Sequence, residues 1–411
     1  MKNKSWLNIS LFQFVLIAII GLMIRLIFTG QDVGFPYKNL VHAHSHVGFL
    51  GWISMAIYVA LIAQFKPDSS HDKAYQRIFI LTEISIIGML ISFPIQGYAL
   101  YSISFSTLFL IASYWFVAKF YNLVKKYPAE LISVKFAKAG LFYLVLSSFG
   151  PWALGPTMAT GHGKDNIYFL IIFFYLHFLY NGAIIMALFA MIFKYLEDQG
   201  LAPKKLAING RRVFFLTNLA VIPTYALSTL WATPDVWVYW LGGIFAVVQV
   251  VAFWYFLPFG KILLQSLIKK NSWAFRLIVL SAAAFVIKLI FQLLSSFPFF
   301  VDDVNLLKST VVMGYLHLVT LGIISFFLIG WFLFLGGFSS RTILAKAGLA
   351  IFVLGVFLTE SYLFGHGLNI WLGGTVQNYA VQLAWVSSLL PVGLGLFWLA
   401  QVLQSPKTKG H

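Results

Sequence analysis

Cysteine is absent from all 411 residues of this chain. Its absence excludes disulfides, thiolate metal sites, iron–sulfur clusters and the C-x-x-C-H motif that attaches haem covalently. Charge is also scarce, since only 10% of the residues are charged whereas 60% are hydrophobic and the mean hydropathy is +0.88. A soluble globular domain carries far more charge, so this composition is typical of a polytopic membrane protein.

Long apolar runs make up most of the chain. Twelve of them approach the ~20 residues that a helix needs to cross a bilayer, and we place them at 6–29, 41–64, 77–97, 100–121, 137–157, 167–193, 212–232, 236–258, 275–297, 309–335, 346–363 and 379–402. The first run is too long for a signal peptide and lacks a small-residue cleavage site, so we interpret it as a span. The pattern predicts one all-α integral membrane domain over residues 1–411.

Basic residues are divided unequally between the two sides of this predicted bundle. With twelve spans, 23 of the 28 Lys and Arg fall in the termini and the even-numbered loops. By the positive-inside rule, this predicts cytoplasmic termini in a bacterial-type inner (plasma) membrane. The net charge of +16 then reflects basic loops against lipid headgroups, and no basic, aromatic-rich soluble segment indicates nucleic acid as a partner.

Histidine occurs near the outward ends of three predicted spans. His42, His44 and His46 begin the second span, His177 lies in the sixth and His317 in the tenth. An ionisable side chain inside a membrane is costly without a partner and therefore indicates a functional site. Imidazole is also a common ligand for metal ions and for haem iron. The three spans together predict a redox or metal site.

His46 and His317 are expected at the same depth. His46 follows Lys38 by eight residues and His317 follows Lys308 by nine, which places both roughly 12–14 Å below the outer boundary at 1.5 Å per residue. A haem with two histidine ligands needs such a pair on different helices. His44 points to another face of its helix, so we choose His46 as the ligand and keep His44 as the second choice.

Four charged residues also lie inside the predicted spans. Glu83, Lys288 and Glu360 are either paired within the bundle or part of a proton route, for which Lys288 and Glu360 are the candidates. Arg25 lies near the outer end of the first span. Its guanidinium either extends to the interface or binds a haem propionate as a bidentate fork.

Three short motifs resemble the large subunit of the haem–copper oxidase superfamily. HAHSHVGFLGW at 42–52 resembles the family's helix-two signature, and YLHFLYNG at 175–182 and GYLHLVTLG at 314–322 fall on its helix-six and helix-ten histidines. The resemblance implies twelve spans, a non-covalent haem b between His46 (or His44) and His317, and reduction of oxygen or nitric oxide. It also implies a quinol or cytochrome as electron donor, and partner subunits.

The chain departs from that family at the second metal. The family's helix seven supplies two adjacent histidines, whereas the predicted seventh span has none, and Tyr315 stands where helix ten would offer a second histidine. His177 remains as a candidate ligand for a second haem or for copper, iron or zinc. The other candidate metal ligands are His42, near the interface, and His162 and His366, each in a Gly-His-Gly turn of an outer loop.

Two functions are compatible with these residues. The first is a haem-containing membrane redox protein, which is either an oxidoreductase acting on oxygen or nitric oxide or a protein that only binds such a gas or passes electrons. The second is a transporter whose His, Lys and Glu are proton-coupled or metal-binding groups. Transporters often contain inverted repeats and broken helices at mid-membrane. The histidines cluster toward one face and the halves show no convincing similarity, so we favour the redox protein.

Overall fold

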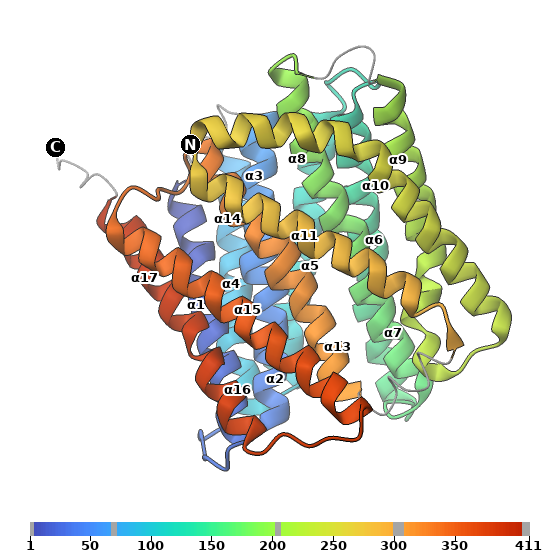
Figure 1. Cartoon of the computed structure of the whole chain (residues 1–411), viewed down its shortest axis with the longest axis vertical. Coiled ribbons are helices and arrows are strands. Elements are labelled where there is room, and N and C mark those ends of the chain that lie inside the picture. Colours follow the sequence, from blue (N-terminus) through green and yellow to red (C-terminus); the bar gives the residue numbers. More distant parts are fainter. Residues whose placement is uncertain (1–3, 67–71, 202–206, 299–307, 405–411) are drawn as a thin grey trace.

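A computed structural model describes residues 4–66, 72–201, 207–298 and 308–404. Within these ranges every regular element is a helix, and the helices form a single bundle (Figure 1). α1 begins and α17 ends at the same end of this bundle (Figure 1). The predicted all-α membrane architecture is confirmed.

The helices follow one another along the chain with short connections. The first half contains α1 (Lys4–Ile27), α2 (Tyr37–His46), the π-helical segment η1 (Val47–Ser54), α3 (Met55–Phe65), α4 (Lys73–Gln96), α5 (Leu100–Val124), α6 (Ile132–Ala159), α7 (Asn166–His177), the π-helical segment η3 (Phe178–Ile184) and α8 (Ile185–Asp198). The second half contains α9 (Ala207–Val221), the 3-10 segments η5 (Pro223–Ser228) and η6 (Leu230–Ala232), α10 (Val236–Lys270), α11 (Ser272–Leu294), α13 (Lys308–His317), the π-helical segment η7 (Leu318–Ser325), α14 (Phe326–Leu335), α15 (Ile343–Trp371), α16 (Tyr379–Ser387) and α17 (Leu389–Leu403).

Eleven of the twelve predicted spans are helical runs long and apolar enough to cross a membrane, as judged over the described residues. The exception is the seventh, predicted at 212–232. There α9 ends at Val221, and Pro223 begins the 3-10 segment η5. Proline has no N–H, and its ring clashes with the preceding turn of an α-helix. The seventh segment is therefore shorter and broken, although it still packs against α6 and α10.

Two of the three histidine-bearing spans lie at the centre of the bundle. In the runs Tyr37–Phe65 and Thr310–Leu335, 83% of the apolar window is buried, compared with 28% in α5 and in α10. Their inner halves, α3 and α14, pack against each other, and α3 also contacts α8 of the third such span. The peripheral helices instead expose large apolar side chains, such as Ile95 and Trp254. A bilayer covers such side chains, so this arrangement fits a membrane protein.

Candidate functional site

Each histidine-bearing span changes from α-helix to π-helix directly after its histidine. α2 ends at His46, α7 at His177 and α13 at His317, and a π-helical segment begins at the next residue in each case. π-helical turns are rare and are frequently found at functional sites. A glycine stands five positions after each histidine, at Gly51, Gly182 and Gly322. This repeated His-x4-Gly spacing is visible in the sequence and marks all three of the spans that contain a π-helical segment.

These glycines let the preceding span approach closely. A Cβ at Gly182 would lie 2.8 Å from Cβ and Cγ of Tyr143 on α6. A Cβ at Gly51 would lie 2.9 Å from Oε1 of Gln13 on α1. Real Cβ atoms essentially never make contacts this short, so a neighbour would have to shift, and only the end of the Gln13 side chain could do so easily. The glycines therefore fix how the histidine-bearing spans sit against their neighbours.

His44 and His317 face each other in the half of the bundle that the sequence predicts to face outward. Their ring centroids lie 6.4 Å apart, with the ring planes at 75°. Two imidazoles that bind one metal ion from opposite sides, through metal–nitrogen bonds of about 2 Å, would have ring centres about 6.3 Å apart. The observed separation matches this value. The His317 side chain is also 23% exposed despite its position inside a span, so space remains beside the ring.

The backbone of α1 sets the orientation of His44. Its Nδ1 lies 3.0 Å from the carbonyl oxygen of Ile17. A carbonyl only accepts, so Nδ1 carries the proton and the lone pair lies on Nε2. A Cβ at Gly21 would lie 3.0 Å from Cε1 of the ring, so glycine leaves the space that the ring occupies. A hydrogen bond of this kind is what usually fixes a metal-binding histidine.

His46, our first choice of ligand, has other partners. Its Nδ1 donates to the carbonyl of His42 at 2.9 Å, and its Nε2 accepts from the Tyr98 hydroxyl at 2.8 Å. Its ring packs against Phe93 with the centroids 4.5 Å apart. The structure therefore brings together the second choice, His44, and His317. Residues two apart on a helix point in nearly opposite directions, so depth alone does not select between them.

Two buried charged side chains border this pair. Arg25, at the end of α1, is 8% exposed, and its charge acts on His44, His317 and Glu360. Glu360 on α15 places Oε1 3.8 Å from Nδ1 of His317. In the described part of the chain, both carboxyl oxygens of Glu360 and Nδ1 of His317 are buried without a hydrogen-bond partner.

Partnerless buried polar atoms are uncommon in native proteins. This group of residues, His44, His317, Arg25 and Glu360, is hereafter the outer cluster. Its two imidazoles, its guanidinium and its orphaned atoms fit a bound haem, because imidazole binds the iron and a guanidinium matches a propionate carboxylate.

His177 is fully hydrogen-bonded inside the protein. It is 1% exposed, and its Nε2 donates to the carbonyl of Val221 at 2.8 Å. Its Nδ1 then accepts from Asn181 Nδ2 at 3.2 Å and from the Ser228 hydroxyl at 3.4 Å. The ring thus joins α7 to η3 and to the broken seventh segment. A metal at His177 would displace one of these bonds.

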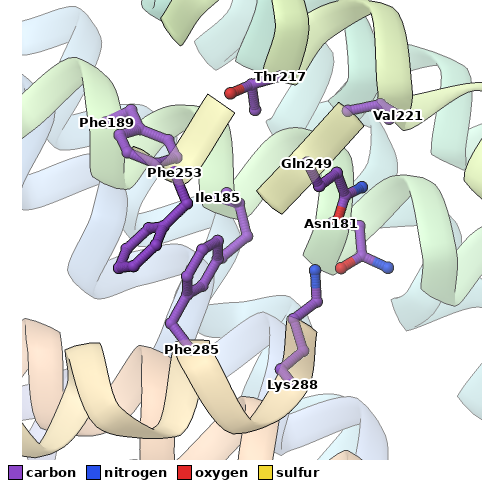
Figure 2. A pocket seen from close by; sticks show the side chains of 9 residues that line it. All are labelled: Asn181, Ile185, Phe189, Thr217, Val221, Gln249, Phe253, Phe285 and Lys288. Atoms are coloured by element: carbon purple, nitrogen blue, oxygen red, sulfur yellow. The ribbon is translucent and has the colours of Figure 1, made fainter. Parts of the chain in front are cut away.

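A cavity of about 20 Å³ lies beside this network (Figure 2). Its lining comes from the helices around the sixth to ninth segments: Asn181, Ile185, Phe189, Thr217, Val221, Gln249, Phe253, Phe285 and Lys288. A space of this size is large enough for one water molecule, although much of its lining is apolar. Lys288 on α11 is 2% exposed and points toward the amides of Asn181 and Gln249 (Figure 2).

Hydrogen bonds orient both of these amides. Asn181 turns its Nδ2 to His177, and Gln249 donates from Nε2 to the Thr224 hydroxyl at 3.2 Å. The oxygens Oδ1 of Asn181 and Oε1 of Gln249 are left buried without a partner among the described residues.

The remaining candidate metal ligands lie apart from one another. His162 pairs with Asp165 at 2.6 Å on the loop between α6 and α7. His366 lies within α15 and not in the predicted loop turn, and its ring stacks on Tyr379 with the centroids 3.6 Å apart. The His42 ring packs edge-on against a tyrosine. Over the described ranges, no three His, Asp or Glu side chains converge as a metal-ion site requires.

The candidate proton-route residues are also separate. Glu83 accepts a hydrogen bond from Gln13 and is therefore paired with α1. Glu360 belongs to the outer cluster, whereas Lys288 lines the cavity near His177. No hydrogen-bonded chain between Glu360 and Lys288 occurs in the part of the protein that the structure describes.

The fold is similar to that of a solved haem–copper terminal oxidase. That structure, entitled "Cryo-EM structure of a heme-copper terminal oxidase dimer provides insights into its catalytic mechanism", gives a TM-score of 0.62 at 12% identity and covers 97% of this chain and 83% of that chain. No family model matches the chain, and no curated protein matches it. The likeness establishes the multi-pass fold, and the chemistry has to be argued from the residues of the chain itself.

Proposed function

We propose that this protein is a haem-binding membrane redox protein that holds one low-spin haem b between His44 and His317. The observation that carries the proposal is the 6.4 Å separation of the two rings. The similarity of the fold to a haem–copper terminal oxidase supports it. A bound haem would supply one-electron redox chemistry.

The residues of the outer cluster have distinct roles in this proposal. His44 and His317 would hold the haem iron, and the Ile17 carbonyl keeps His44 in the tautomer that leaves Nε2 free. Arg25 would bind a propionate carboxylate with its buried guanidinium. His46, which lies outside the outer cluster, is instead hydrogen-bonded to Tyr98 in the turn between α4 and α5.

Electron transfer or gas binding fits the chain better than gas reduction at a second metal. Both ring nitrogens of His177 are engaged in hydrogen bonds, and the described residues offer no three-ligand site. Electrons would come from a quinol or a cytochrome, with a partner subunit as one route. The membrane would be a bacterial-type inner membrane.

The visible spectrum of the purified protein tests this proposal. We expect a Soret band and, after reduction, sharp α and β bands. Substituting His44 or His317 with alanine should abolish the low-spin spectrum, and free imidazole should restore it in part. His46→Ala is the matched control, because it removes the same side chain two residues away and should leave the spectrum unchanged.

A colourless wild-type protein would overturn the proposal and favour the transporter hypothesis. A spectrum lost in His46→Ala but retained in His44→Ala would reverse the ligand assignment. The protein yield and the chromatographic profile in detergent show whether each variant has folded.

A further inference from the structure

Glu360 is a buried carboxyl group that the proposed haem ligation does not use. It lies on α15, its side chain is 13% exposed, and its Oε1 is 3.8 Å from Nδ1 of His317. Neither carboxyl oxygen has a hydrogen-bond partner among the described residues. A carboxyl group inside a membrane requires a partner or a function.

The two imidazoles of the outer cluster differ in what faces their Nδ1 atoms. His44 donates to the neutral carbonyl of Ile17 at 3.0 Å. Nδ1 of His317 has no partner, and Glu360 is the group in front of it. If Nε2 of His317 binds iron, Nδ1 must carry the proton and needs an acceptor. A shift of about 1 Å would bring Glu360 to hydrogen-bond distance.

We propose that Glu360 is a positioning residue that accepts the Nδ1 hydrogen of His317 and lowers the reduction potential of the haem. This inference rests on the proposed function, because it needs a haem bound to His317. A carboxylate on the outer nitrogen makes a histidine ligand more basic and fixes its ring. A more basic axial ligand favours the oxidised iron, and hydrogen bonding to axial ligands is an established means of tuning haem potentials.

The two imidazoles thus differ in the oxygen that faces Nδ1. It is the backbone carbonyl oxygen of Ile17 at 3.0 Å for His44 and a carboxyl oxygen of Glu360 at 3.8 Å for His317.

The test is a spectroelectrochemical titration of the whole protein in detergent. We expect Glu360→Gln to keep the low-spin spectrum and to shift the reduction equilibrium about tenfold toward the reduced form, which is about 59 mV upward for one electron. The EPR spectrum of the oxidised haem should change as well, because it reports the axial ligand field. Glu83→Gln is the matched control, since it also replaces a carboxyl group inside a span, and it should change neither the potential nor the EPR spectrum.

Each outcome separates the two proposals. An absent Soret band in the wild-type protein overturns the haem proposal and this inference with it. A haem whose potential is unchanged or lower in Glu360→Gln overturns the inference alone. A raised potential with an unchanged EPR spectrum also overturns it, because a distant charge would then suffice. Loss of haem from folded Glu360→Gln, with retention in Glu360→Asp, supports it.

Discussion

Gly182→Ala tests whether close contact between spans fixes the position of the π-helical segment η3. The new Cβ would lie 2.8 Å from both Cβ and Cγ of Tyr143. Carbon atoms attract best at about 3.5–4.0 Å, so one of the two must move by about 0.7 Å or more. Tyr143 is 2% exposed, and its hydroxyl bonds to Asn218 at 3.1 Å. The ring therefore cannot retreat.

Overpacking of this kind costs about 1–3 kcal/mol. We expect a lower apparent melting temperature for the intact protein in detergent, measured by tryptophan fluorescence. Gly395→Ala on α17 is the matched control, because nothing lies within 4 Å of its new Cβ. Alanine is favoured over glycine in a helix by about 0.5–1 kcal/mol, so this control should be as stable as the wild type or more stable.

A double variant shows whether the clash with Tyr143 is the cause. Tyr143→Ala destabilises by itself, but it also removes Cγ and the rest of the ring that the new methyl group would meet. Adding Gly182→Ala should then cost less than it does in the wild type, because residues in contact do not contribute independently. Equal stability of Gly182→Ala and Gly395→Ala would refute the reasoning.

Two further predictions concern Asp72, at the N-cap of α4, and the outer cluster. Burial alone would raise the pKa of Asp72, but the hydrogen bonds from Lys66 and from the first turn of α4, with the charge of Lys119, lower it. The ionised Asp72 therefore stabilises the folded protein at every pH above the pKa that Asp72 has in the unfolded chain. This stabilisation is lost as the pH falls through the lower pKa that Asp72 has in the folded protein. Asp72→Asn keeps the helix cap and should lower stability at neutral pH by less than about 1 kcal/mol, with the difference from wild type vanishing in melting curves at low pH. Gly21→Val should reduce the haem content of the purified protein, because a Cβ at this position would lie 3.0 Å from the His44 ring. A full haem complement in the folded variant would contradict the assigned position of that ring.

The membrane spans could be predicted because length and apolarity decide them locally. The break in the seventh segment was visible as Pro223, but apolarity alone does not show that a helix ends there. The difference between His44 and His46 could not be resolved by counting residues. Which side of α2 faces α13 depends on packing against α1, where Gly21 and Ile17 hold His44.

The partners of the ionisable groups were the least predictable part of the site. Arg25, Glu360 and His317 come from α1, α15 and α13, which are far apart in the sequence. His177 stays a predicted candidate metal ligand, and its bond to Val221 depends on the broken seventh segment. Pairwise contacts of this kind exist only once the helices are assembled.

The π-helical segments have a consequence for how such a protein can diverge. A π-helical turn amounts to one residue inserted into an α-helix, and one residue is about 100° of rotation. The insertions in η1, η3 and η7 rotate the outer half of each span about its axis relative to the inner half. The inner halves are α3, α8 and α14. The inner halves can remain a constant scaffold while the outer halves gain, lose or turn their ligands. A substitution in an outer half would therefore leave the direction that the inner helices face unchanged.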